Sequence, residues 1–480
     1  MGSASFEFLG FSAAVILVLN LAARSVLWRQ AVLLVASIAF LSFFSHAPQA
    51  WLPLVAFLAC GYASLRAMQS GKGKAGYAPI LIGLIFAYVW LKKYTFLPEP
   101  LFLSFSYVTL GLSYVFFRVL HVVIDAHDGL IAEPVGVVSY VNYTLNFTTF
   151  VSGPIQRYQD FASMQLSPTP PPLDVVVAGE ALERIIIGFF KVNVLSLLLA
   201  MLQTQALNTL PVDGGFAVNL SKGIVIAAVY PLYLYFNFSG YIDIVIGVAR
   251  FLRIRLPENF NRPFSADNFL NFWSRWHITL SEWLKTYVYN PLLMTLMRRF
   301  PSPRIEPFLG VLAFFVTFFL IGVWHGRTSV FLFFGVLQGL GVSVNKLYQV
   351  LMAKRMGRKR YRAWANNGVY NCFARGLTFT WFTFTLLWFW SNWQQLGFLW
   401  NRLGFPVIVA VWAAIFLGSS VVLAGWEWLR SGVLSLRWGG QPVLLSRYVR
   451  TVWGTALAVL AVATAMLLSV PAPDVVYKAF

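Results

Sequence analysis

The sequence has few charged residues and almost no cysteine. Charged residues occupy 11% of its 480 positions, less than half of the roughly 25% that a soluble domain carries. Acidic residues are the scarcest, with 17 Asp and Glu against 36 Lys and Arg, which leaves a net charge of +19. Cys60 and Cys372 lie far apart, in or beside apolar runs. This excludes a disulfide framework and a thiolate metal cluster, and no metal site is predicted.

Long apolar runs take the place of the missing charge. A helix of about 20 apolar residues crosses a hydrocarbon core of about 30 Å, and about a dozen such runs recur along the chain. We therefore predict an all-α, polytopic integral membrane protein with about 11–12 transmembrane helices. The runs are 8–23, 31–44, 51–68, 77–91, 101–124, 185–202, 224–248, 308–324, 330–352, 368–390, 406–428 and 452–470.

The basic residues cluster between apolar runs, as in the segments 298–304 and 354–362. Lys and Arg in alternate loops are typical of cytoplasmic loops, so both segments are predicted to face the cytoplasm. Without a recognisable binding module, this charge does not indicate nucleic-acid binding. Arg24 and Arg29 follow the first run and no basic residue precedes it, which predicts a retained first span with its N-terminus outside.

Residues 256–293 are too polar to span the bilayer and too aromatic for a free loop. Phe269, Trp273, Trp276, Leu280 and Leu284 recur at intervals of three and four residues, and polar residues recur on another face. We predict an interfacial or re-entrant amphipathic helix. Such a segment is tolerated at membrane depth only inside protein or beside a water-filled cavity.

Ionisable residues inside the apolar runs are candidates for function, because each is costly in lipid. Arg118, His121 and Asp125 share one helical face, where they form either a buried ion pair with a histidine between its members or a functional cluster. Asp243 stands alone in its run. It either bonds a backbone group or an arginine from another helix, or it lines a cavity.

Two further histidines are the strongest candidates for chemistry. His277 lies on the predicted amphipathic helix, and His325 follows an apolar run with only a few residues before the next run begins. His325 is therefore expected at or below the membrane surface. A neutral histidine can take a proton from a hydroxyl nucleophile, although a histidine beside a tryptophan is also common as a packing residue.

The sequence around these histidines resembles the membrane-bound O-acyltransferase family. The resemblance rests on residues 272–281 (FWSRWHITLS) and on residues 322–326 (GVWHG), whose histidine follows the first by 48 positions. It is strongest for the bacterial branch that contains alginate O-acetylase and the D-alanyl transfer protein of teichoic acids. Residues 152–155 (SGPI), 238–243 (FSGYID) and 257–264 (PENFNRPF) match further family stretches in the expected order.

The resemblance implies a fold and a site. It implies a ring of transmembrane and re-entrant helices around a thinned centre, with a core at about residues 100–350 and peripheral helices at 1–99 and 368–480 of a single membrane domain. His325 is the implied catalytic residue, with His277 beside it. Arg275, Trp276, Trp324, Asn261 and Asp243 are the residues expected to line the substrate, and Arg275 or Trp276 is a candidate donor to the oxyanion.

The implied reaction moves an acyl group, most simply acetyl, from a cytoplasmic thioester to a hydroxyl outside. The donor is acetyl-CoA or an acyl-carrier protein acting as co-substrate, and no bound cofactor is expected. The acceptor is an exported polysaccharide, as in exopolysaccharide acetylation, or a periplasmic acyltransferase partner, and the location is the bacterial inner membrane. D-alanylation or another acylation of an envelope polymer is the alternative within the family.

Two departures from the family pattern bear on specificity. Lys285, Thr286 and Tyr287 stand where bacterial relatives have Arg-Asp-Tyr, and Asn237 stands where the family often has a carboxylate. Two readings from other classes also remain open. One is a transporter or flippase, against which the lack of an internal repeat argues. The other is a catalytically silent scaffold for a polysaccharide synthase.

Overall fold

A computed structural model describes residues 5–71, 73–131, 133–211, 214–438, 441–443, 446–468 and 473. Within these residues the regular secondary structure is helical, apart from a two-residue antiparallel pairing of β1 (Arg437–Trp438) with β2 (Gln441–Pro442) and one isolated bridge. In the described part, eight helices are long and apolar enough to cross a membrane, and two shorter apolar helices precede them. The prediction of an all-α, polytopic membrane protein is thereby confirmed.

The chain packs as two compact units. The first comprises residues 1–189, 240–257 and 470–480, and the second comprises residues 190–239 and 258–469. The first contains α1 (Phe6–Leu21), α2 (Val26–Ser42), η1 (Pro48–Trp51), α3 (Leu52–Gln69), η2 (Lys74–Gly76), α4 (Tyr77–Leu91), η3 (Glu99–Leu101), α5 (Leu112–His127), α6 (Val137–Thr144), α7 (Tyr158–Gln165), nearly all of α8 (Val175–Phe190) and the last part of α10 (Phe216–Phe251).

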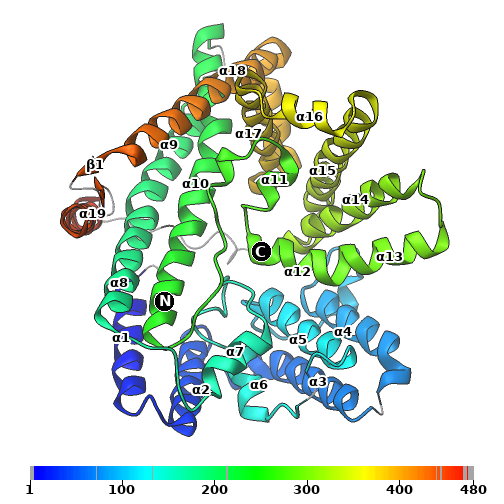
Figure 1. Ribbon diagram of the computed structural model, residues 1–480, viewed down its shortest axis with the longest axis vertical. Coiled ribbons are helices and arrows are strands. Elements are labelled where there is room, and N and C mark those ends of the chain that lie inside the picture. The colour runs from blue at the N-terminus through cyan, green and yellow to red at the C-terminus, as the bar shows by residue number, and fades with distance from the viewer. Residues whose placement is uncertain are drawn as a thin grey trace. The chain divides into compact units, whose positions relative to one another are not determined.

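The second unit holds η4, α9, the first part of α10 and the elements that follow α10. Its helices are η4 (Lys191–Ser196), α9 (Leu197–Asn208), η5 (Pro263–Ser265), α11 (Phe269–Trp273), α12 (Ile278–Leu284), η6 (Lys285–Tyr289), α13 (Asn290–Arg299), α14 (Glu306–His325), α15 (Ser329–Met356), α16 (Arg358–Ala365), α17 (Gly368–Trp390), α18 (Trp393–Ser435) and α19 (Arg447–Leu468). Figure 1 shows α14 beside α15, and these two helices pack closely.

Glycine allows α14 and α15 to approach each other. A Cβ atom added to Gly322 would lie 2.2 Å from the Cα of Gly335, and one added to Gly339 would lie 2.8 Å from the carbonyl oxygen of Phe315. Small residues at a helix interface let backbones approach in membranes, where no hydrophobic effect drives helices together. The close approach anchors the C-terminal end of α14, where His325 lies.

Several helix boundaries differ from the predicted spans. The predicted span 101–124 becomes a helix only at Leu112, because Gly111 adopts the left-handed conformation that ends the preceding turn and begins α5. The span 406–428 is part of the 43-residue α18, which bends where Gly404 has a φ of 72° just before Pro406. Proline removes a backbone donor, so a bend at this position is expected.

Candidate functional site

The segment that we predicted as interfacial or re-entrant, called the re-entrant segment below, is not a single amphipathic helix. It contains the short helix α11 and a second helix in which α12 continues through η6 into α13. α11 ends at Trp273, and α12 begins at Ile278. Between them Trp276 forms an antiparallel bridge with Phe260. Two flanking hydrogen bonds extend the pairing, from the amide of Asn261 to the carbonyl of Arg275 (2.9 Å) and from the amide of Ile278 to the carbonyl of Asn259 (3.0 Å). The chain thus turns back on itself at this point.

His277 occupies the break between α11 and α12. Its backbone has φ 45° and ψ 52°, the left-handed region, and its side chain is fully buried. Few residues other than glycine adopt this conformation, so the surrounding pairing must hold it. Strained positions of this kind occur often at functional sites.

Asn259 sets the orientation of the His277 ring. Its side-chain oxygen accepts hydrogen bonds from the amide (3.1 Å) and hydroxyl (2.9 Å) of Thr279 and lies 3.3 Å from Nδ1 of His277. A backbone N–H can only donate, so the Asn259 atom that receives it is the oxygen. Nδ1 of His277 must therefore donate to it, and the neutral ring presents Nε2 as an acceptor.

His325 is the last residue of α14 and is 3% exposed. Its ring is surrounded by aromatic rings, with centroid distances of 5.1 Å to Phe389, 5.9 Å to Phe334 and 4.7 Å to Trp324. The following residue must be glycine, because a Cβ atom at Gly326 would lie 2.0 Å from the ring of Phe331. The glycine after the histidine is therefore explained by this close contact.

The ring of one tryptophan lies close to the rings of both histidines. The ring centroid of Trp324 lies 6.3 Å from that of His277 and 4.7 Å from that of His325. His277 comes from the re-entrant segment and His325 from a long apolar helix. The structure thus brings three of the predicted site residues together in a buried, aromatic environment.

A cavity of about 260 Å³ is lined by residues that lie near the two histidines in the chain, while His277, Trp324 and His325 are not part of its lining. It is lined on one side by the re-entrant segment and on the other by α14. Ile278 directly follows His277, and Ile321 lies one helical turn before His325. Glu282 and Lys285 add charge to the lining, so the cavity combines apolar walls with a few polar groups, as ligand-binding pockets do.

Three other predicted site residues lie on the bridged segment. Trp276 is buried against Phe272 and Phe382, with centroid distances of 5.7 and 5.0 Å. Nε of Arg275 donates to the side-chain oxygen of Asn271 at 2.9 Å. Asn261 is exposed, and its backbone N–H donates to the carbonyl of Arg275. Arg275 and Trp276 directly precede His277 in the chain, and Asn261 lies on the segment paired with them, while the predicted roles of all three stay predictions.

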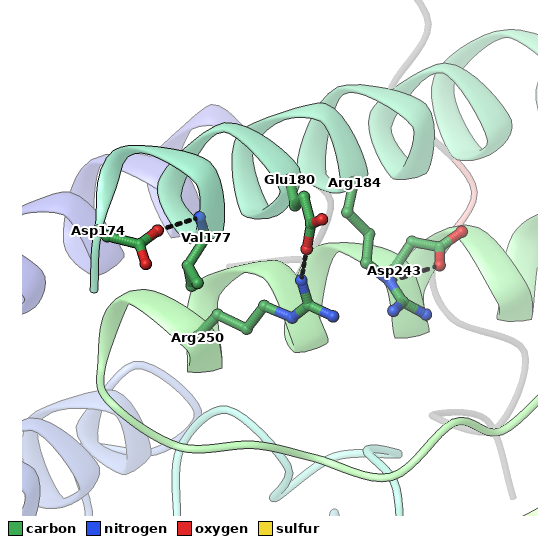
Figure 2. Close-up of polar contacts among 6 residues, drawn as sticks. All are labelled: Asp174, Val177, Glu180, Arg184, Asp243 and Arg250. Atoms are coloured by element: carbon green, nitrogen blue, oxygen red, sulfur yellow. Dashed lines mark hydrogen bonds and ion pairs between the residues drawn. The ribbon is translucent and has the colours of Figure 1, made fainter. Parts of the chain in front are cut away.

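Asp243 lies in the first unit, on α10, where Arg184 of α8 binds it. Nε of Arg184 donates to the carboxylate at 3.0 Å, and a second ion pair of 3.0 Å joins Arg250 to Glu180 between the same helices. Figure 2 shows the two ion pairs along the α8–α10 contact, and Asp174 capping the start of α8. Of the alternatives open from the sequence, an arginine from another helix is the partner found.

Comparison with known proteins identifies the group to which the chain belongs. The model of the MBOAT, membrane-bound O-acyltransferase family matches residues 84–389, more than half of the chain. The chain belongs to the membrane-bound O-acyltransferase family. The match includes the two histidines and all the residues that line the cavity, so the expected resemblance is confirmed.

Individual relatives act on different envelope polymers. The chain is 28% identical over 258 residues to a teichoic acid D-alanyltransferase of Bacillus subtilis, covering 51% of this chain and 62% of the relative. It is 41% identical over 119 residues to a peptidoglycan O-acetyltransferase of Helicobacter pylori, covering 25% and 21%. It is 28% identical over 260 residues to a probable alginate O-acetylase of Pseudomonas aeruginosa, covering 54% and 46%. In each case the chain spans less than two thirds of the relative.

In the first unit, Arg118, His121 and Asp125 make contacts that differ from the buried ion pair suggested by the sequence. Arg118 donates to the carbonyls of Tyr143 (3.4 Å), Thr144 (2.9 Å) and Thr149 (2.7 Å). Nε2 of His121 accepts the amide of Tyr158 at 2.9 Å, and Nδ1 lies 3.5 Å from Asp125.

These contacts hold the loop after α6 against helix α5. The loop carries residues 152–155, one of the family stretches noted above. The contacts with backbone groups and with Asp125 are those of a structural cluster.

Sequence reasoning missed two residues that organise the site. One is Asn259, which lay inside a family stretch but drew no separate attention. The other is Glu427 of α18, outside the matched region, which lies 3.7 Å from Arg262 and accepts a hydrogen bond from Ser265. The lone carboxylate in an apolar run was a signal for Glu427, and its partners are distant in sequence.

Both departures from the family pattern are located by the structure. Lys285 lines the cavity between the re-entrant segment and α14, and Asn237 is fully buried in α10. A lysine in place of an arginine changes a flat, forked donor into a point charge. Lys285 therefore places a point charge, and not a forked donor, on the wall of this cavity.

Proposed function

We propose that this chain is an O-acyltransferase that moves an acyl group, most simply acetyl, from a thioester to a hydroxyl on an exported polysaccharide or a periplasmic carrier. The observation that carries the proposal is the pair of buried histidines on either side of Trp324, inside the region that matches the family. The donor is acetyl-CoA or an acyl-carrier protein, which supplies the thioester from the cytoplasm.

His325 is the proposed general base. Its imidazole takes the proton of the acceptor hydroxyl while the hydroxyl oxygen attacks the thioester carbonyl carbon. The C–O bond forms, the C–S bond breaks, and the proton passes to the departing thiolate. His325 ends α14, where the partial negative charge of the helix C-terminus favours the imidazolium that forms during transfer.

His277 and the cavity have supporting roles in this proposal. Asn259 holds His277 with Nε2 as an acceptor, suited to receive a hydrogen bond from a substrate or from Trp324. The cavity between α14 and the re-entrant segment is a narrow, partly charged space suited to the thiol arm of the donor. Its lining by Ile321, one turn from His325, supports this assignment.

The decisive experiment is mass analysis of envelope and secreted glycans from cells that carry the wild type or His325→Ala. Loss of one acyl mass in the variant would support the proposal and identify the group that is moved. His127→Ala, a change at a half-exposed histidine in the first unit, is the matched control. An unchanged acylation profile, with the variant protein present in the membrane, would turn the assignment to a transporter or a scaffold.

D-alanyl transfer to an envelope polymer is the second candidate. The observation in its favour is the similarity to teichoic acid D-alanyltransferases, including 32% identity over 243 residues to that of Streptococcus thermophilus. The same mass analysis separates the two candidates, because acetyl and alanyl groups add different masses.

The sidedness of transfer is a separate expectation. We propose that the protein resides in the bacterial inner membrane with the basic segment 354–362 in the cytoplasm. A cysteine placed at Ala363 in α16 should resist membrane-impermeant maleimide in intact spheroplasts and react after permeabilisation. Reaction before permeabilisation would reverse the predicted orientation.

A further inference from the structure

A large apolar groove lies in the first unit, in a region that the proposed reaction does not use. Its volume is about 690 Å³, within the range of about 300–1,000 Å³ that is typical of pockets for small ligands. α2, η1, α3 and α6 form it, and its walls include Leu41, Leu54, Leu58 and Val141.

The floor of the groove is apolar because its two tyrosines are already bonded. The hydroxyl of Tyr140 donates to the carbonyl of Leu58, and that of Tyr62 donates to the carbonyl of Val135, both at 3.0 Å. The two rings pack against each other with centroids 5.2 Å apart. With the hydroxyl groups engaged by the backbone, the floor presents ring and methyl surface to an occupant.

The rim of the groove continues into the lipid-facing surface. Ile38 is 56% exposed, Val55 is 57% exposed and Val137 is 56% exposed, and all three line the groove. In a multi-pass membrane protein, apolar side chains this exposed face hydrocarbon rather than water. The groove is therefore open to the bilayer, and lipid is the molecule next to it.

One end of the groove is polar. Ser42, Ser45 and His46 line it where α2 ends and η1 begins. Nε1 of Trp51 donates to the carbonyl of Ser45 at 3.1 Å, which places an indole at this end, and tryptophan is enriched at the level of lipid headgroups. Within the described part of the chain, the exposed imidazole of His46 makes no hydrogen bond or ion pair.

We propose that this groove is a binding site for one phospholipid. An acyl chain lies along the apolar walls between α2, α3 and α6. The phosphate lies at the polar end, where N–H of His46 and the hydroxyl of Ser45 are donors suited to its oxygens. The site is independent of the proposed acyl transfer, and a lipid bound there would brace the contact between α2, α3 and α6.

The test uses the full-length protein, delipidated in detergent, with dioleoylphosphatidylglycerol added and bound lipid counted by native mass spectrometry. Ala59→Trp fills the groove, whereas Ala56→Trp changes an exposed residue on the same helix that does not line it. We expect one tightly retained lipid in the wild type and in Ala56→Trp. Occupancy at equal lipid concentration should be at least fivefold lower in Ala59→Trp.

Two further measurements test the headgroup assignment. His46→Ala should lower the occupancy of the phospholipid while leaving that of dioleoylglycerol, which has no phosphate, unchanged. Equal retention of phospholipid by Ala59→Trp and Ala56→Trp would overturn the site. Equal retention of dioleoylglycerol and phospholipid by the wild type would overturn the placement of the phosphate, and a retained glycan-linked lipid would replace the proposed occupant.

Discussion

Each unit of the molecule buries ionisable side chains, but it surrounds them differently. In the first unit, the guanidinium of Arg118 is held by three backbone carbonyls, and His121 is fixed by a backbone amide and Asp125. In the second unit, the rings of His277 and His325 lie against aromatic side chains, and Ile278 and Ile321, close to them in the chain, line a cavity. Polar groups that are held by backbone stabilise the fold, whereas buried titratable rings in an aromatic environment near a cavity are the arrangement found at functional sites.

The comparison predicts opposite outcomes for the two clusters, and the largest effect is expected at His325. His325→Ala should lower the rate of acyl transfer by about 10²- to 10⁴-fold, the range typical for loss of a general base. The variant should still fold, with a melting temperature in detergent that is lowered only by the cavity that the buried ring leaves, so the loss of activity should far exceed the loss of folded protein. Transfer at the wild-type rate would remove His325 from the chemistry.

Arg118→Leu should show the reverse pattern. The change leaves three buried carbonyl oxygens without their donor, so the free energy of unfolding should fall by on the order of 3 kcal/mol. Chemical denaturation in detergent would measure it, with the exposed Arg66→Leu as control. A variant as stable as the wild type but inactive would give the first cluster a role in chemistry and break the comparison.

A smaller effect on activity is expected at Asn259, a positioning residue. Asn259→Ala removes the acceptor that fixes the ring of His277, and kcat should fall between about 10- and 100-fold, because small misplacements of reacting groups are costly. The KM for the acyl donor should stay near its wild-type value, and the rate should be expressed per folded protein measured by size-exclusion chromatography, because loss of folded enzyme would also lower the apparent kcat at constant KM. Asn366→Ala, at an exposed turn, is the control.

The smallest effect is expected at the ion pairs of Figure 2. Arg184 and Asp243 are 20% and 14% exposed, and such partly exposed pairs contribute about 1 kcal/mol or less. A double-mutant cycle of Arg184→Gln and Asp243→Asn, read by chemical denaturation, should give a coupling energy of that size. Loss of acyl transfer in Asp243→Asn, with stability unchanged, would instead return Asp243 to the substrate-lining group.

Periodicity predicted the buried side of the re-entrant segment but not its backbone. Phe269, Trp273 and Leu280 are all buried, as their spacing indicated. The same spacing suggested one continuous helix, yet the chain breaks at His277. The break depends on pairing with Phe260, a contact that no local pattern around residue 277 encodes.

The two histidines were predicted from the sequence, whereas their surroundings were not. Trp324 was named as a neighbour of the substrate because it precedes His325, but its contact with His277 arises only from the packing of α14 against the re-entrant segment. Asn259 and Glu427 were overlooked for a similar reason. The roles of their polar groups follow only from their hydrogen-bond partners, which lie 20 and 162 residues away in the sequence.

The sequence by itself determined that lipid surrounds most of the protein and that the protein is built of helices. Apolar runs of membrane length must satisfy their own backbone hydrogen bonds in lipid, which requires helices whatever their neighbours are. The tertiary structure alone decided which buried polar group serves which purpose. Arg184 binds Asp243 across 59 residues, and Asn259 orients His277 through a bridged strand, because a buried charge or ring takes its partner from whatever the fold brings near.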